Sequence, residues 1–139
     1  MIVSETKIRV YYEDTDQMGV VYYGNYARYY EIGRTEMIRE LGFTYKEMEA
    51  LNIMLPAHSL KVNYLKPARY DELLTVRTTI ESIPKVKFPI KTEIYNESGE
   101  LINYGETVLA FFNSKTQKPC PAPKYFVEEM ARVFNKPKE

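Results

Sequence analysis

At 139 residues, the chain has room for one domain with a sizeable core, but not for two domains of ordinary size. Hydrophobic residues make up 45% of the chain and charged residues 27%, proportions that exclude disordered and collagen-like proteins. The 19 basic residues equal the 19 acidic residues, so no overall electric field indicates nucleic acid as a partner. We therefore expect a single domain over residues 1–139.

The cysteine and histidine content restricts both the cellular compartment and the metal chemistry. Cys120 and His58 are the only residues of their kinds, so one chain forms neither a disulfide nor a Cys/His metal cluster. The first residues lack the pattern of a secretion signal, and no run of about 18 apolar residues occurs. We expect a cytoplasmic protein that binds no metal and does not insert into membranes.

The first half of the chain changes its hydrophobic period once. Apolar and charged side chains alternate over residues 6–13, which predicts a half-buried strand. Aspartates and glycines break this period over residues 13–25 and predict a long loop. Apolar residues then recur every three or four positions from Tyr26 to Leu41, which predicts one long amphipathic helix. Asn25 is its expected N-cap and Gly42 its expected left-handed C-terminal cap.

The second half of the chain returns to a period of two after Pro56. Short turn-like connections separate the alternating segments, so we expect an antiparallel meander. Pro89 requires an edge position or a bulge, because proline has no N–H to donate. The predicted strands cover residues 58–64, 74–80, 86–94 and 102–112, and short helical segments are expected at 44–51 and 125–134.

These elements define the fold class. Five antiparallel strands with one apolar face, covered by one long helix, make a two-layer α+β domain. We expect its core at about residues 6–113, followed by a C-terminal tail with a short helix at 124–134.

Two segments resemble a known family. The run VYYEDTDQMGVVYYGNY at residues 10–26 resembles the signature of the 4-hydroxybenzoyl-CoA thioesterase family, in its YbgC-type acyl-CoA thioesterase branch. The resemblance continues through Glu31, residues 34–36 and the run YLKPARYDE at 64–72. It implies a hotdog fold, a five-stranded antiparallel sheet wrapped around one long central helix. It also implies hydrolysis of an acyl-CoA thioester to a free carboxylic acid and CoA without a cofactor.

The resemblance assigns catalytic roles to two positions. The family's essential carboxylate falls on Asp16, as nucleophile or as a base that activates water. The oxyanion donor falls on the backbone N–H of Tyr23, at the helix start, where unpaired N–H groups favour negative charge. Some YbgC-type members have a histidine at the position of Tyr23, which leaves the substrate range and rate open. Gly24 would let the substrate pass close to the backbone, and Tyr26 could line the acyl pocket.

The family's sites lie at a dimer interface, so the resemblance implies a homo-oligomer, either a dimer or a dimer of dimers (a homotetramer). The phosphates of CoA would meet basic residues near the mouth of the site. The candidates are Lys61, Arg69, Lys85 and Lys87. Neither the acyl chain nor the carrier, CoA or acyl-carrier protein, follows from the sequence.

Each candidate also has a structural interpretation. An isolated loop aspartate such as Asp16 is more often a turn residue, and Asp14 is the better candidate for bonding loop N–H groups. His58, at the start of an apolar face, is more often a core or rim residue than a catalyst. Catalysis by His58 would favour an acyl-thioester hydratase or dehydratase. A non-catalytic acyl-CoA-binding module is a third alternative, which the intact Asp16 motif disfavours.

Overall fold

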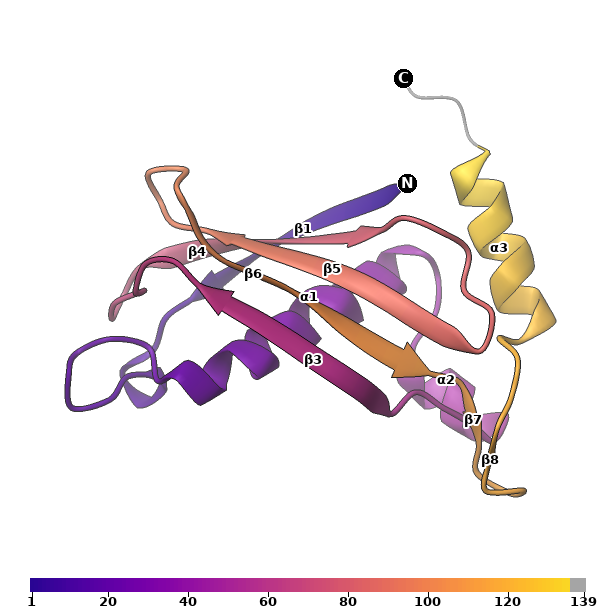
Figure 1. Cartoon of the computed structure of the whole chain (residues 1–139). Coiled ribbons are helices and arrows are strands. Elements are labelled where there is room, and N and C mark those ends of the chain that lie inside the picture. Colours follow the sequence, from indigo (N-terminus) through magenta and orange to yellow (C-terminus); the bar gives the residue numbers. More distant parts are fainter. Residues whose placement is uncertain (136–139) are drawn as a thin grey trace.

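The computed structural model describes residues 1–135 and has two layers (Figure 1). A five-stranded antiparallel sheet, in the order β1-β4-β5-β6-β3, packs against the long helix α1 (Tyr26–Glu40). Its strands are β1 (Ile2–Arg9), β3 (Ala57–Tyr64), β4 (Leu73–Ile80), β5 (Lys87–Tyr95) and β6 (Leu101–Ala110). The predicted α+β class is confirmed. The predicted domain span of 1–139 includes residues 136–139, which lie outside the described range.

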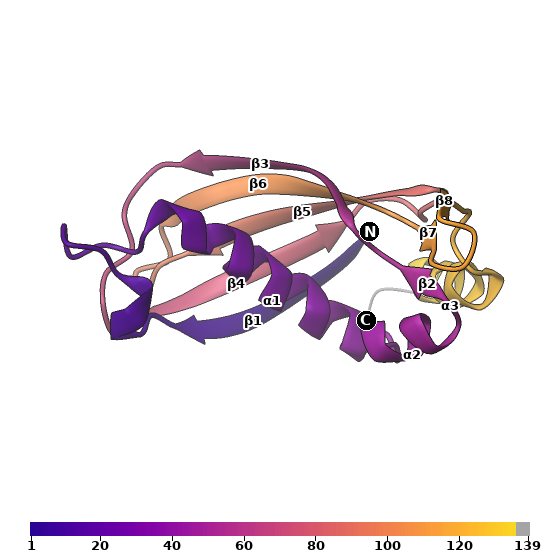
Figure 2. The same ribbon diagram turned by 90° about the horizontal axis from the view of Figure 1, so that it is seen from below.

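Helix α1 lies along one face of the sheet, as the view from below shows (Figure 2). Close approach depends on Gly33, because a Cβ there would stand 2.7 Å from Thr78 Oγ1 and 2.8 Å from Val76 Cγ1. Tyr29 and Tyr30 follow the helical period and are fully buried against the sheet, as expected of core residues. This close packing fixes the distance between α1 and the sheet, and so positions the N-terminus of the helix.

The strand β1 ends four residues earlier than the sequence predicts, at Arg9 instead of residue 13. Its eight residues pair with β4, from Ile2 opposite Ile80 to Arg9 opposite Leu73. The chain then turns into a short 3₁₀ segment, Tyr12–Asp14. Because the Asp14 carboxylate accepts the Tyr11 N–H, this backbone leaves the sheet.

The meander of β4, β5 and β6 is confirmed, but β3 pairs with β6 at the opposite edge instead of with its sequence neighbour β4. Pro89 lies in the interior strand β5, beyond the residues Lys91–Tyr95 that pair with β4. It therefore occupies a local edge, as predicted. His58 falls in an irregularity of the β3–β6 ladder between Ala57 and Ser59.

Both ends of α1 lie where the sequence predicts them, but only the C-terminal cap has the predicted conformation. Gly42 adopts φ of 95° after the last turn of α1, which confirms the left-handed cap. Asn25 does stand at the N-cap position of α1, but its backbone is already helical and its side chain makes no cap bond, because it donates to the Asp14 carbonyl. A 3₁₀ turn, Tyr23–Asn25, instead precedes α1, and Tyr22 is the non-helical residue before it.

The remaining elements close one end of the sheet (Figure 1). The two predicted helical segments are confirmed as α2 (Tyr45–Ala50) and α3 (Lys124–Phe134). Phe126 of α3 packs against Phe43, Phe88 and Phe111 in the apolar cluster at that end. A small second sheet joins β2 (Ile53–Met54), β7 (Phe112–Asn113) and β8 (Lys118–Pro119). Among residues 1–135, no helix is long and apolar enough to span a membrane.

Candidate active site

The loop that carries the predicted site is held by Asp14. Its side chain is only 6% exposed, forms an ion pair with Arg28 of α1, and accepts the Tyr11 N–H at 2.9 Å. Its backbone carbonyl accepts the Tyr22 N–H and the Asn25 side-chain amide, both at 2.9 Å. Asp14 thus joins the start of the loop to its end, which confirms the structural role predicted for it.

Asp16 lies in a tight turn within this loop and is half-buried. Its carboxylate Oδ1 accepts the Met18 N–H at 2.8 Å, and its own N–H donates to the Val20 carbonyl at 2.9 Å. No hydrogen bond within residues 1–135 uses the other carboxylate oxygen. The turn geometry proposed as the structural interpretation is therefore present. It also restricts the rotation of the carboxylate, and so orients its second oxygen.

Tyr23 begins the helical segment. Its N–H is one of the first in that segment, which have no partner within a helix, and no hydrogen bond among residues 1–135 uses it. The next residue is Gly24, and a Cβ there would stand 2.7 Å from the Tyr22 ring, so a larger residue would require that ring to move. The hydrogen bond with Tyr23 is the largest cause that raises the pKa of Tyr22, and the Asp16 charge adds to it. Tyr22 therefore remains a neutral phenol beside the loop.

A hollow of about 320 Å³ opens beside Tyr23, and we refer to it as the Tyr23 hollow. Tyr64, at the end of β3, donates its hydroxyl to the Tyr23 carbonyl at 3.2 Å and packs edge-on against Tyr26, with ring centroids 5.5 Å apart. Burial raises the pKa of Tyr26, so its hydroxyl is a neutral hydrogen-bonding group. The lining residues are Val20, Val21, Tyr23, Tyr26, Tyr64, Leu65, Lys66 and Pro67. Tyr64 is not among the residues predicted for the site, although it begins the second family-like run.

Within one copy of the protein, the four basic residues predicted to bind CoA do not lie together at one site. Arg69 is next to the site, because it pairs with Val20 in an isolated β-bridge. Lys61 lines a separate hollow with Thr79 of β4 and Lys91 of β5. Lys85 and Lys87 lie where β5 begins. Lys87 pairs with Ala110 at the end of β6, whereas Tyr23 lies beside Tyr64, which pairs with Asn103 near the start of β6.

His58 is also separated from the site within one chain. It is exposed at the start of β3, six residues before Tyr64. At a strand rise of about 3.3 Å per residue, this places it roughly 20 Å from the Tyr23 hollow. Among residues 1–135, no three His, Cys, Asp or Glu side chains are grouped as metal ligands.

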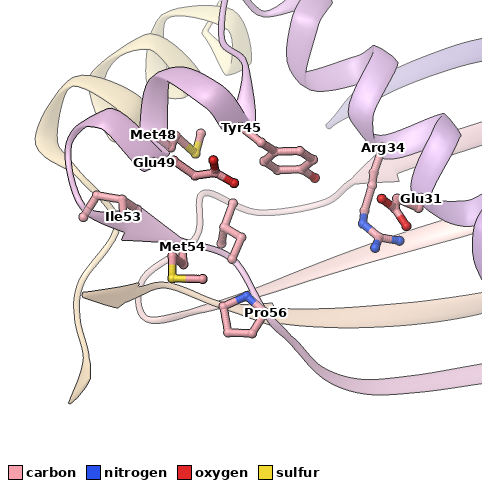
Figure 3. Close-up of a pocket in the computed structure, with 9 residues that line it drawn as sticks. Glu31, Arg34, Tyr45, Met48, Glu49, Ile53, Met54 and Pro56 are labelled. Carbon is pink, nitrogen blue, oxygen red and sulfur yellow. The ribbon is translucent and has the colours of Figure 1, made fainter. Parts of the chain in front are cut away.

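A second pocket, of about 300 Å³, lies between α1, α2 and β2 (Figure 3). We refer to it as the Arg34 pocket. Its walls are apolar, apart from Arg34 and Tyr45 inside and two carboxylates at its rim. The lining residues are Glu31, Arg34, Tyr45, Met48, Glu49, Ile53, Met54, Leu55 and Pro56. This pocket was not predicted, since it forms only where α2 folds back beside α1.

Comparison with known proteins places the chain in a family. The model of the thioesterase-like superfamily matches residues 10–132. The protein YneP of Bacillus subtilis is 43% identical over 101 residues, which cover 73% of each chain. The acyl-CoA thioester hydrolase YbgC of Escherichia coli is 35% identical over 122 residues, which cover 88% of this chain and 91% of YbgC.

Among solved structures, DHNA-CoA thioesterase from Staphylococcus aureus superimposes with a TM-score of 0.90. It is 40% identical, and the match covers 96% of this chain and 92% of that one. This likeness confirms the expected hotdog fold. The chain therefore belongs to the thioesterase-like superfamily and, within it, to the YbgC-type acyl-CoA thioesterases, which are thioester hydrolases.

Proposed function

We propose that this protein hydrolyses an acyl-CoA thioester to a free carboxylic acid and CoA, with Asp16 as the reacting carboxylate. The observation that carries the proposal is that one loop, held by Asp14, presents two groups with complementary charge. Asp16 has one tethered oxygen and one oxygen without a hydrogen-bond partner among residues 1–135, and Tyr23, at the start of the helical segment, has an N–H that no described residue accepts. A nucleophile or base beside a preorganised oxyanion donor is the arrangement that acyl transfer needs.

The proposed reaction needs only water as a second reactant. The Tyr23 N–H stabilises the charge that develops on the thioester oxygen. The open Asp16 oxygen either attacks the carbonyl carbon, to form an anhydride that water then cleaves, or removes a proton from an attacking water. In both routes the C–S bond breaks, the acid gains the water oxygen, and CoA leaves as a thiolate that takes up a proton. No cofactor enters this scheme.

The absence of a histidine at position 23 is compatible with this chemistry. A thiol has a pKa of about 8.5, so a thiolate leaves without prior protonation. An amine or alkoxide leaving group would need a general acid at that point. The proposal therefore restricts the reaction to thioesters, and esters and amides of the same acids should be poor substrates.

We also propose that two copies pair through β3. This strand lies at the edge of the sheet, and none of its side chains is buried: Leu60 is 45% exposed and Tyr64 is 52% exposed. An open, partly apolar edge is a template for pairing with another strand. Two copies of one strand related by a two-fold axis run antiparallel. We further propose that two such dimers associate into a homotetramer.

The proposed pairing makes the site composite. The Arg34 pocket ends at Pro56, immediately before β3, whereas the Tyr23 hollow lies at the other end of β3, at Tyr64. Antiparallel pairing of two such strands places the Arg34 pocket of one copy beside the Tyr23 hollow of the other. The same arrangement brings Lys85 and Lys87 of the second copy toward Arg69, where they could bind CoA phosphates together.

The test is the release of thiol from a panel of aliphatic and aromatic acyl-CoAs by the native protein, Asp16→Asn and the control Glu13→Gln. Glu13 is an exposed carboxylate in the same loop. We expect native protein and control to release thiol and the free acid, and Asp16→Asn to be at least about a hundredfold slower. Thiol release by Asp16→Asn at the native rate would refute the role of Asp16. Hydration of an enoyl-CoA without thiol release would favour the hydratase, and binding without any turnover would favour the binding module.

A further inference from the structure

A further hollow opens where β1 ends and β4 begins, and we refer to it as the Tyr70 hollow. It has a volume of about 470 Å³. The rings of Tyr12 and Tyr70 form two adjacent walls, with centroids 5.8 Å apart and planes at 82° to each other. It shares no lining residue with the Tyr23 hollow or the Arg34 pocket. The other lining residues are Arg9, Val10, Tyr11, Glu13 and Asp71.

Both rings of the Tyr70 hollow are held in water by fixed turns. Tyr12 is 78% exposed and Tyr70 is 56% exposed. The Tyr12 carbonyl accepts the N–H and the hydroxyl of Thr15, at 3.1 and 2.7 Å. Asp71, next to Tyr70, has a left-handed φ of 70° and donates its N–H to the Val10 carbonyl at 2.9 Å. Such a backbone costs free energy outside glycine and is concentrated at functional sites. The turns thus present two aromatic faces to a ligand.

The two ring faces have no cationic partner in the part of the chain that the structure describes. An aromatic face carries partial negative charge and attracts a cation within about 6 Å of the ring centroid. Two arginines within residues 1–135 lie over tyrosine rings, but those rings are Tyr29 and Tyr95. A cation from solution is therefore the partner that the rings of Tyr12 and Tyr70 attract.

The charges around the Tyr70 hollow also favour a cation. Arg9 donates a hydrogen bond to the Asp71 carbonyl at 2.6 Å and forms an ion pair with Glu97 at 3.9 Å, so its positive charge is compensated. Glu13 and Asp71 are exposed and form no ion pair within residues 1–135. Two uncompensated carboxylates attract a cation and repel the phosphates of a nucleotide.

The lining groups distinguish between kinds of cation. A metal ion such as Ca²⁺ takes about six to eight oxygen ligands, whereas the side chains of the hollow include only two carboxylates. A primary ammonium group needs acceptors for its three N–H groups. A quaternary ammonium group has no N–H to donate, and aromatic walls are the surface that recognises it.

We propose that the Tyr70 hollow binds a small quaternary ammonium ion. Tyr12 and Tyr70 form two walls of an aromatic cage around its methyl groups, and the Asp71 carboxylate supplies the opposite charge. This site gives the protein a second ligand besides acyl-CoA, and its occupancy does not require hydrolysis.

The test is titration calorimetry with tetramethylammonium, choline and 3,3-dimethyl-1-butanol, which has the shape of choline but carbon in place of the charged nitrogen. Phosphocholine adds the phosphate of a lipid head group. The variants are Tyr12→Leu, Tyr70→Leu and Asp71→Asn, together with Tyr12→Phe, which keeps the ring face. Asparagine tolerates a left-handed backbone as aspartate does, so Asp71→Asn removes the charge and keeps the turn. Tyr104→Leu is the control, because Tyr104 is an exposed tyrosine of β6 outside this hollow.

We expect the native protein and the control to bind both cations, and to bind choline at least about tenfold more tightly than its uncharged analogue. Each leucine variant should weaken choline binding by about tenfold, and Asp71→Asn should weaken it by about three- to fivefold. Tyr12→Phe should bind choline like the native protein. Melting temperatures should stay close to the native value, because the exchanged side chains are exposed.

Equal affinities for choline and its uncharged analogue would overturn the inference, because the hollow would then act only as an apolar surface. Native protein that binds neither cation, or leucine variants that bind choline like the native protein, would overturn it as well. Tighter binding of phosphocholine than of choline would contradict a free cation and indicate a lipid head group. No thioester is present in these titrations, so failure of the proposed hydrolysis would leave their outcome unchanged.

Discussion

Replacing Asp14 by alanine should destabilise the fold by about 3 kcal/mol, because two hydrogen bonds to a buried carboxylate are lost. One comes from the Tyr11 N–H at 2.9 Å, and the other comes from the Arg28 guanidinium. Hydrogen bonds to charged groups each contribute about 1.5 to 3 kcal/mol. Arg28 is 50% exposed, so water replaces part of its interaction and the lower end of that range applies. For a chain of this length the melting temperature should fall by roughly 10 °C.

Urea unfolding of Asp14→Ala, Arg28→Ala and the double variant measures this effect. Arg28→Ala leaves the Asp14 carboxylate buried with one partner, so it should cost about 2 kcal/mol. The double variant should lose less than the sum of the single variants, since the two residues share one interaction. Glu36→Ala, which breaks an exposed ion pair with Arg39, is the control and should change stability by less than about 0.5 kcal/mol. Additive losses, or an Asp14→Ala variant as stable as the native protein, would refute the reasoning.

Three further predictions concern other parts of the molecule. Gly33→Ala gains about 1 kcal/mol of helix propensity, yet its Cβ would stand 2.7 Å from Thr78 Oγ1. We therefore expect a net loss of about 1 to 2 kcal/mol in urea unfolding, and a stabilised variant would contradict the close packing of α1. Tyr64→Phe removes the hydrogen bond to the Tyr23 carbonyl and keeps the ring, so kcat/KM should fall by about three- to tenfold, whereas native kinetics would exclude a positioning role. Burial raises the pKa of Cys120, so at pH 7 less of it is thiolate than in a free cysteine. Its alkylation should be slower than that of glutathione and should rise with pH, and an equal rate at pH 7 would contradict its partial burial.

Most of the fold could be predicted from the sequence, because hydrophobic period is a local property. The change from a period of two to 3.6 near Tyr26 and the position of Gly42 located α1 correctly. The predicted element ends are wrong where a side chain forms a hydrogen bond with the backbone that competes with regular secondary structure. Asp14 takes the Tyr11 N–H and ends the first strand early, and Asn25 bonds the Asp14 carbonyl instead of capping the helix. Neither of these side-chain hydrogen bonds can be predicted from the spacing of hydrophobic residues.

The candidate site was predicted only in its contiguous part. Asp16 and Tyr23 belong to one short motif, so the sequence resemblance sufficed to select both. The Arg34 pocket was missed, because residues from three elements form it and none of them belongs to a catalytic pattern. Lys85 and Lys87 were selected by charge alone, and within one chain the fold separates them from Tyr23. The distances between these lysines and Tyr23 depend on which strands pair in the sheet, and no local sequence pattern predicts that pairing.

The central claim is that the Asp16 carboxylate performs chemistry and does not merely hold its turn. Asp16→Asn keeps an oxygen that can accept the Met18 N–H, so the turn should survive while the charge is lost. Single-turnover hydrolysis of the best acyl-CoA, with the dissociation constant measured in parallel, tests the claim most directly. We predict a rate constant at least about a hundredfold lower in the variant, with a dissociation constant within about threefold of the native value. A variant that retains more than about a tenth of the native rate constant would contradict the claim.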